Sequence, residues 1–263
     1  MLHKSMLDLK WLESQGKFLN DDKMEPRLTI AYSYYEEPEL LEKQAQLWED
    51  YPPGVEIFVV DDGSQKYPAL DILKRTYFPY GPNIQLWTVD EDLGFNSHGC
   101  RNLAATYAPT DPVLFLDMDI TLNPCDVGSI RRIAFKDGRH YMFNAYIRHK
   151  KNFVPCPGHI NMFITTKKTY WDAGGYDESF TGWHYGDREF HERLEAASTK
   201  NNTGITLTIE RGGRDMYVDP DQESRMVYDN KNMKLIYRDE LPDFNILKGT
   251  QPNKLVFPYT RIL

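Results

Sequence analysis

Hydrophobic and polar positions follow two alternating patterns between residues 27 and 120. Short apolar runs, typical of buried strands, are separated by segments in which apolar residues recur every three or four positions, as on one face of a helix. We predict strands at 27–35, 54–62, 84–90 and 112–120, and helices at 38–51, 66–78 and 96–108. Strands that alternate with helices in this way predict an α/β fold, with a mostly parallel sheet and helices on both faces.

The pattern is less regular beyond residue 125. We predict helices at 126–135, 167–174 and 187–198, and strands at 141–147 and 160–166. In the last helix, Phe190, Leu194 and Ala197 form the predicted core face. Glu189 and Arg193 have the spacing of an ion pair on the helix surface.

The same pattern predicts the domain organisation. Residues 1–25 have the spacing of a short amphipathic helix followed by a polar linker. We expect a single domain over 26–240 that consists of a regular half at 26–120 and a less regular half at 121–240. Residues 241–263 are expected to form a C-terminal tail that wraps the domain.

Composition excludes several classes of protein. Hydrophobic residues make up 41% of the chain and charged residues 27%, which is typical of a globular domain and not of a disordered chain. The formal charge of −8 makes general nucleic-acid binding unfavourable, because the phosphate backbone is also negative. The three cysteines match no zinc or redox motif, and no apolar run is long enough for a membrane span or signal peptide. We therefore expect a cytoplasmic protein.

Aspartates follow two of the predicted strands. Asp61 and Asp62 end the second strand, and Asp117 and Asp119 end the fourth. The carboxyl ends of parallel strands are the usual ligand-binding edge of such a sheet. Carboxylates two residues apart repel each other unless a cation lies between them, and their oxygens suit Mg²⁺ or Mn²⁺. Taken alone, Asp117 and Asp119 are equally consistent with a cap, and Asp61 and Asp62 are better explained by a turn, but two pairs at one edge favour a nucleotide site with a metal.

A glycine-bounded aromatic loop precedes the helix that Asp187 opens. It contains Trp183, His184 and Tyr185. An aspartate in the first helical turn is often only a cap, and histidines such as His184 and His191 more often pack or face solvent than bind a ligand. An aromatic ring beside a carboxylate nevertheless suits a sugar that stacks on the ring and turns a hydroxyl toward a base. We expect these three loop residues to contact an acceptor.

Five segments, taken in order, resemble glycosyltransferase family 2 and the related galactosyltransferase C-terminal domain, both of the GT-A fold. They are IAYSYYEEPELL, VVDDGS, DLGFNSHGCRN, VLFLDMDI, and the stretch from NMFITT to GDREFHERL. Each segment is weak alone, but their order and spacing are specific. The resemblance implies a Rossmann-like GT-A fold, with a nucleotide-binding half at 26–120 and an acceptor half at 121–240. It also implies a reaction that moves a sugar from a nucleoside-diphosphate sugar to an acceptor hydroxyl. By analogy we expect a UDP-sugar donor and a Mn²⁺ or Mg²⁺ cofactor.

The resemblance also implies roles for particular residues. Asp187 matches the general base of inverting transfer, and Trp183 matches a tryptophan at the acceptor site. Asp117 and Asp119 are similar to the D-x-D motif, in which Asp119 is the expected direct metal ligand. With the tyrosines that follow the first strand, the expected donor-binding residues are Tyr34, Tyr35, Asp61, Asp62, Gly94, Arg101, Asn102 and Asp117.

The chain departs from the family pattern at several positions. Gly186 replaces the glutamate that normally precedes the base, and Glu36 replaces an asparagine after the first strand. His184 and Tyr185 replace two glycines, and no histidine follows His191 to serve as the metal ligand found in the galactosyltransferase relatives. We therefore expect weak metal binding that depends on donor phosphates and water.

Three functions are consistent with these features. The first is an inverting, metal-dependent glycosyltransferase with Asp187 as general base. The second is a non-catalytic protein that binds a carbohydrate or nucleotide sugar on the same scaffold. A sugar-phosphate nucleotidylyltransferase shares the architecture, but it would need a glycine-rich loop after the first strand, and YSYYEEPE contains no glycine.

Overall fold

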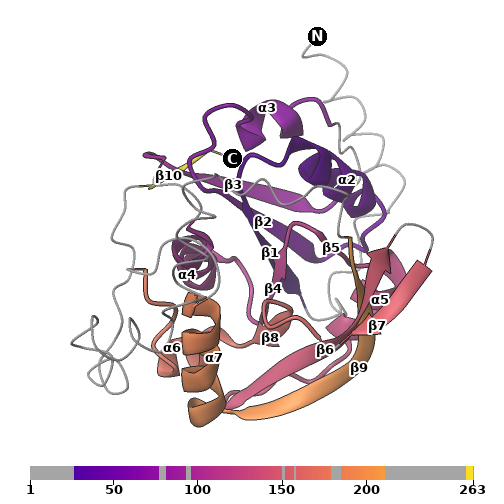
Figure 1. Cartoon of the computed structure of the whole chain (residues 1–263), viewed down its shortest axis with the longest axis vertical. Coiled ribbons are helices and arrows are strands. Elements are labelled where there is room, and N and C mark those ends of the chain that lie inside the picture. The colour runs from indigo at the N-terminus through magenta and orange to yellow at the C-terminus, as the bar shows by residue number, and fades with distance from the viewer. Residues whose placement is uncertain are drawn as a thin grey trace, which may run out of the picture.

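The alternating strands and helices predicted over residues 27–120 form the centre of the computed structural model (Figure 1). The structure describes residues 27–76, 81–92, 96–149, 152–156, 158–178, 185–210 and 259–262, so the predicted helix at 1–25 lies outside the described residues. The elements of this part are β1 (Leu28–Tyr34), α2 (Pro38–Trp48), β2 (Val55–Asp61), α3 (Ala69–Leu73), β3 (Asn83–Val89), α4 (Ser97–Tyr107) and β4 (Val113–Asp117).

The remaining elements belong to the second half of the chain. They are β5 (Ile120–Thr121), α5 (Pro124–Arg131), β6 (Arg139–His149), β7 (Asn152–Cys156), β8 (Phe163–Thr165), α6 (Lys167–Asp172), α7 (Tyr185–Ala197), β9 (Thr199–Ile209) and β10 (Tyr259–Arg261). None of the helices in the described part of the chain has the length and apolar character that a bilayer crossing requires.

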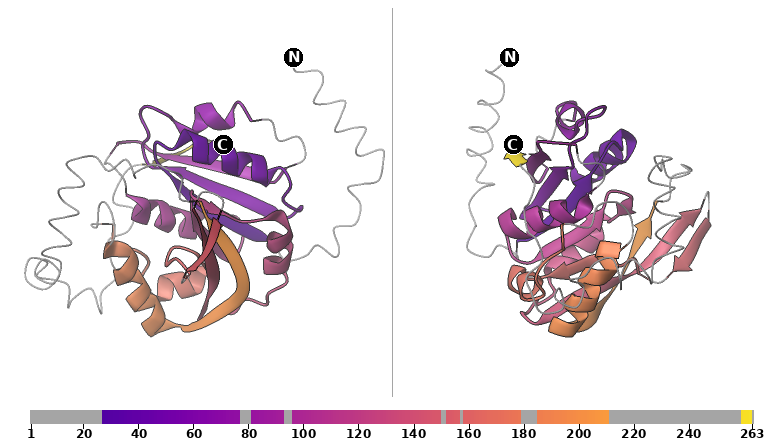
Figure 2. Two further views of the ribbon diagram at one scale, coloured as in Figure 1. Left: turned by 45° about the vertical axis from the view of Figure 1, so that its right-hand side comes forward. Right: turned by 60° about the vertical axis from the view of Figure 1, so that its left-hand side comes forward.

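One mixed sheet connects the two halves. Its strand order is β10-β3-β2-β1-β4-β8-β6-β9-β5, with β7 paired to the outer part of β6. The central strands β3, β2, β1 and β4 are parallel, whereas β8 joins β4 in the antiparallel direction. Helices cover both faces of this sheet, as predicted (Figure 2).

The register of the central strands places the expected site residues at one edge. Tyr34 pairs with Asp61 between β1 and β2, and Ser33 pairs with Asp117 between β1 and β4. Both aspartates therefore lie at the carboxyl edge of the parallel strands, where α/β proteins bind their ligands.

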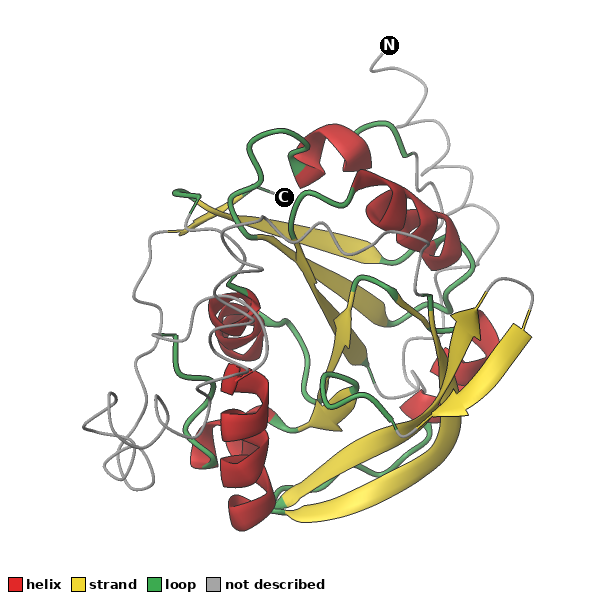
Figure 3. Ribbon diagram, viewed as in Figure 1, coloured by secondary structure: helices red, strands yellow, loops and turns green. Residues whose placement is uncertain are grey.

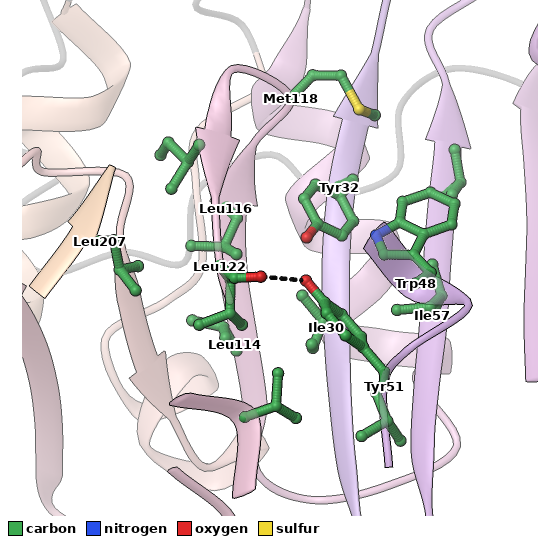
Figure 4. Close-up of a cluster of buried hydrophobic side chains, with 14 of the residues drawn as sticks. Ile30, Tyr32, Trp48, Tyr51, Ile57, Leu114, Leu116, Met118, Leu122 and Leu207 are labelled. Carbon is green, nitrogen blue, oxygen red and sulfur yellow. Dashed lines mark hydrogen bonds between the residues drawn. The ribbon is translucent and has the colours of Figure 1, made fainter. Parts of the chain in front are cut away.

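Two apolar cores lie on opposite faces of the sheet, because alternate residues of each strand point to opposite sides. On one face, Ile30 and Tyr32 of β1 pack with Trp48 of α2 (Figure 4). The Tyr51 hydroxyl donates a hydrogen bond to the carbonyl of Leu122 in this core, at 2.9 Å. The other core joins the sheet to α4, α6 and α7, the group of helices that holds the site (Figure 3).

The predicted strand at 112–120 is two strands. β4 ends at Asp117, and the chain turns through Met118 and Asp119 into the short strand β5, which pairs with β9. The Asp119 carbonyl accepts the backbone N–H of Glu210 at 2.7 Å. Asp119 thus lies in a turn after the strand, and the expectation that it continues the strand with Asp117 is wrong.

Three strands were not expected from the sequence. β9 is largely exposed over its polar first half, so it lacks the apolar run that marks a buried strand. β7 forms a hairpin with β6, and β10 adds the end of the chain to the edge strand β3. At β10 the Tyr259 hydroxyl lies 2.7 Å from that of Tyr107, and both rings pack on Trp87.

Some expected helical details are also corrected. Residues Ala69–Leu73 form a short helix in place of the one predicted at 66–78. Ala197 is exposed, whereas His191 is buried against Phe163 and contributes to the core face of α7. Glu189 and Arg193 form the expected ion pair, at 2.5 Å, but it is largely buried instead of lying on the surface.

Candidate active site

Arg101 joins two aspartates that come from distant parts of the chain. It lies in the second turn of α4, and its side chain is only 3% exposed. Its Nη2 donates to Oδ1 of Asp117 at the end of β4, at 2.5 Å, and its Nη1 donates to Oδ1 of Asp187 in the first turn of α7, at 2.8 Å. Nη1 also lies 3.1 Å from Oγ of Ser97, and the ring of Tyr176 lies under the guanidinium. The site is therefore formed where α4, α7 and β4 meet (Figure 1).

Asn161 bridges the same two carboxylates from the loop that precedes β8. Its Nδ2 donates to Oδ2 of Asp117 at 2.9 Å and to Oδ2 of Asp187 at 3.2 Å. His159, on the same loop, places Nδ1 3.6 Å from Oδ2 of Asp117. Asp117 and Asp187 thus belong to one hydrogen-bond network, although 70 residues separate them in the sequence.

The charges in this network determine the state of Asp187. Burial opposes ionisation of its carboxyl, but Arg101, His98 and Asn161 outweigh that effect and hold its pKa below the usual range for aspartate. The Asp187 carboxylate is therefore ionised at neutral pH. In this form it can accept a proton.

His98 is a further neighbour of Asp187 and approaches the same carboxylate oxygen as Arg101. Its ring is buried and stacks on Tyr176, with the ring centroids 5.2 Å apart. Its Nε2 lies 3.6 Å from Oδ1 of Asp187. A Cβ atom placed on Gly186 would lie 2.5 Å from the imidazole, so only glycine fits before Asp187 while His98 keeps this position.

The two aspartates at the end of β2 have different surroundings. Asp61 accepts the backbone N–H of Ser64 at 2.9 Å and that of Ala69 at 2.7 Å, so both its oxygens stabilise the turn and the start of α3. Asp62 accepts the backbone N–H of Asn96 and contacts the Cys100 thiol. Burial raises the pKa of Asp62 to about 8, because these neutral donors offset only part of the desolvation.

Comparison with known proteins identifies the family. The sequence pattern described as Glycosyl transferase family 2 matches residues 30–195, which is more than half of the chain. The chain belongs to glycosyl transferase family 2. The protein is accordingly a glycosyltransferase by family. Among curated proteins, none matches the chain significantly.

Solved structures confirm the GT-A glycosyltransferase fold of this family 2 member. A mannosyltransferase from Pyrobaculum calidifontis, solved with GDP-Man and Mn²⁺, is 13% identical with a TM-score of 0.56, and the match covers 88% of this chain and 72% of that chain. TarS from S. aureus, as the fragment 1–349, is 15% identical with a TM-score of 0.51, and 71% of this chain matches 58% of that fragment. In a second structure of TarS the match covers only 35% of the TarS chain, at a TM-score of 0.50 and 16% identity. At these identities the likeness concerns the fold.

Not all of the donor residues predicted for this glycosyltransferase are placed to contact a nucleotide. Tyr34 is fully buried and donates its hydroxyl to the carbonyl of Tyr67, at 2.5 Å. Asn102 uses its whole amide within the protein, since Nδ2 donates to Tyr176 and Glu178 and Oδ1 accepts from Tyr170 and Tyr176. The polar groups of Tyr34 and Asn102 are therefore used within the protein, and we assign neither residue a donor contact.

Tyr35 and Glu36 lie at the turn after β1. The Tyr35 hydroxyl donates to Oδ1 of Asp92 at 3.0 Å, on the side of the fold where Asp62 lies. Glu36 adopts a positive φ of 52°, and its carboxylate accepts the backbone N–H groups of Gln65, Lys66 and Tyr67. The glutamate that departs from the family pattern thus holds the loop after Asp62 in place.

The expected metal ligands fit a divalent cation in their chemistry. Asp119 is half-buried in the turn after β4, close in sequence to Asp117. Asp117 is already paired with Arg101, which makes Asp119 the better candidate for direct coordination. In the ranges that the structure describes, no three His, Cys, Asp or Glu side chains gather to hold a metal ion. Two carboxylates completed by phosphate oxygens and water are, however, a common way to bind Mg²⁺.

Some predicted site residues lie outside the described part of the chain, and two residues of the site were not predicted. Gly94, Trp183 and His184 lie outside the described residues, and the backbone of Tyr185 begins α7. Sequence reasoning missed His98 and Asn161. Asn161 begins the segment NMFITT, but the resemblance gives that asparagine no role, whereas the unusual glycine at position 186 is a signal that another side chain occupies the space beside the base.

Proposed function

We propose that the protein is an inverting glycosyltransferase that moves a sugar from a nucleoside-diphosphate sugar to an acceptor hydroxyl. The observation that carries this proposal is the network in which Arg101 and Asn161 hold the Asp187 carboxylate next to Asp117. It joins the candidate base on α7 to the strand edge where α/β folds bind nucleotides.

In the proposed reaction, Asp187 receives the proton of the acceptor hydroxyl as the hydroxyl oxygen attacks the anomeric carbon. The bond from that carbon to the donor's phosphate oxygen breaks, and the nucleoside diphosphate leaves with the bonding electrons. A carboxylate with a lowered pKa is a weak base, so the proton moves only as the new carbon–oxygen bond forms. General-base assistance of this kind typically contributes about 10²–10⁴-fold to the rate.

Residues around the base define the remaining roles. We assign direct metal coordination to Asp119, with Asp117 beside it, and the metal when bound would neutralise charge on the leaving diphosphate. Asp61, Asp62, Gly94 and Arg101 remain the proposed contacts of the nucleotide, together with Tyr35. Trp183, His184 and Tyr185 remain the proposed contacts of the acceptor.

Three departures from the family pattern motivate the alternative, a non-catalytic binding protein: Gly186, Glu36 and the lack of a histidine after His191. Gly186 and Glu36 each have a physical reason that does not involve loss of catalysis, whereas the missing histidine has no structural explanation. His98 occupies the space beside Gly186, and Glu36 caps three backbone N–H groups. The enzyme is therefore the better-supported proposal.

A panel of nucleotide sugars tests the proposal. UDP-, GDP-, CMP- and dTDP-sugars are added with Mn²⁺, and with Mn²⁺ plus EDTA, and both the melting temperature and the release of free nucleotide are measured. We expect one nucleotide class to raise the melting temperature and to be turned over; at 100 times its Kd, a ligand stabilises by about 2.7 kcal/mol. Asp119→Ala should weaken both effects. If a nucleotide sugar stabilises the protein and still releases no nucleotide, whichever hydroxyl acceptor is supplied, that result would favour the non-catalytic binding protein over the enzyme.

A further inference from the structure

The residue before Asp187 is a glycine because a side chain from another helix occupies the space beside it. The imidazole of His98, in the first turn of α4, sits against Gly186 so closely that a Cβ there would lie 2.5 Å from ring atoms Cε1 and Nε2. A glutamate, which the family resemblance places before the base, is excluded by the same contact. His98 and Gly186 are thus spatially complementary across α4 and α7.

His98 is held firmly in this place. Its side chain is 2% exposed and its ring stacks on that of Tyr176 at an interplanar angle of 28°. The Tyr176 backbone is fixed in turn by Asn102, which accepts its N–H and donates to its carbonyl. The imidazole cannot move away from Asp187 without disturbing this stack.

We propose that His98 is a positioning residue that fixes the orientation of the Asp187 carboxylate, and that Gly186 is glycine in order to admit it. This inference rests on the proposed function, because Asp187 is the proposed base.

Arg101 does not hold Asp187 independently of Asp117. Arg101 divides its donors between Asp187 and Asp117, and Asn161 also bonds both carboxylates. These two residues link the carboxylates to each other, so a shift of one aspartate moves the other. His98 contacts Asp187 and the neighbouring Gly186, and it links the proposed base to α4 and Tyr176.

The first test uses stability alone and needs no substrate. Gly186→Ala is compared in the wild-type and His98→Ala backgrounds, and His98→Ala is compared in the wild-type and Asp187→Asn backgrounds, by urea unfolding. We expect Gly186→Ala to raise the unfolding equilibrium constant at least tenfold more when His98 is present than when it is alanine, because the added Cβ clashes only with the imidazole. Residues in direct contact typically show such non-additivity, and additive effects in both cycles would overturn the proposal.

The second test separates positioning from a merely structural role. His98→Ala should lower kcat about 10- to 100-fold, which is the effect of misplacing a catalytic group by about 1 Å, while the Kd for UDP or GDP with Mn²⁺ stays within about threefold. His98→Gln keeps an N–H donor at a similar reach and should recover most of kcat. The matched control is His140→Ala, which removes another buried imidazole, one that contacts Ser198 instead of Asp187, and should leave kcat unchanged.

The outcomes distinguish the two proposals. If His98→Ala does not fold, His98→Gln and Gly186→Ala supply the stability and kinetic comparisons. Unchanged kcat in a folded His98→Ala variant would overturn the positioning role. If the wild type turns over no nucleotide sugar, the proposed function fails, and the unfolding cycles still decide whether His98 holds Asp187.

Discussion

Two carboxyl groups in the candidate site have pKa values that move in opposite directions. Asp62, directly after β2, has the Asn96 N–H and the Cys100 thiol as neutral donors, and burial, with smaller contributions from Asp61 and Asp92, raises its pKa to about 8. Burial also opposes ionisation of Asp187, yet Arg101 reverses the outcome and lowers its pKa. The contrast shows that burial alone does not assign a role to an acid, because the nearest cation decides its charge.

This difference suits the two ends of the proposed reaction. A carboxyl that is easily protonated at the end of β2 can exchange hydrogen bonds with a nucleotide without adding charge near its phosphates. A carboxylate held ionised at the start of α7 can take a proton from a hydroxyl.

Arg101 is the residue whose loss should disturb the site most. Arg101→Met should destabilise the protein by about 3–5 kcal/mol, because Asp117 and Asp187 would keep their charges without a buried cation. It should also raise the pKa of Asp187. Urea unfolding measures the first effect, and Arg188→Ala is the control, since its exposed pair with Glu192 should be worth at most about 0.5 kcal/mol. A loss as small as that of the control would show that Arg101 does not hold the two acids.

Asp62 should make stability depend on pH in the opposite sense to an ordinary acid. Between its unfolded pKa near 4 and its folded pKa of about 8, the folded protein retains a proton that the unfolded chain releases, so stability falls as pH rises. We expect wild type to lose on the order of 3 kcal/mol between pH 5 and pH 8.5 through this group. Asp62→Asn, which does not titrate, should lose correspondingly less when both proteins are unfolded in urea at the two pH values. Parallel pH profiles for the two proteins would show that Asp62 titrates normally.

Glu36 should contribute a smaller effect at the loop beside Asp62. Glu36→Ala removes the acceptor of three backbone N–H groups and should cost about 1–2 kcal/mol. Glu36→Asn should cost less, because asparagine tolerates the positive φ and keeps an acceptor. Thermal unfolding of both variants, with Glu39→Ala on the neighbouring helix as a reference, checks this order. Equal stability of the Glu36→Ala, Glu36→Asn and Glu39→Ala variants would contradict the role of Glu36 as the acceptor of these N–H groups.

Much of the fold could be predicted from the sequence. The strands β1, β2 and β3 and helices α2 and α4 fall close to their predicted bounds, because each has a clear apolar period. β9 could not be found in this way, since its exposed first half is stabilised by pairing with β6 and carries little apolar signal of its own. The break after Asp117 was missed because β5 forms through distant pairing with β9.

The sequence predicts that the candidate site lies at the carboxyl edge of the sheet, but it does not predict which side chains contact one another there. The rule that ligands bind at the carboxyl edge located Asp62 and Asp117, and the family resemblance located Asp187. The sharing of Arg101 by two acids depends on how α4 packs against α7, which no local pattern encodes. His98 and Asn161 come from that packing as well, so they are visible only once the chain is folded.

The most direct test of the account is transfer by Asp187→Asn with the nucleotide sugar that the wild type uses. The substitution keeps the size of the side chain but removes the base, so kcat should fall about 10²–10⁴-fold while the Kd of the donor nucleotide is unchanged. Asp172→Asn is the control, because Asp172 is a surface residue paired with Lys168. A kcat for Asp187→Asn within threefold of the wild type would contradict the claim that Asp187 is the general base.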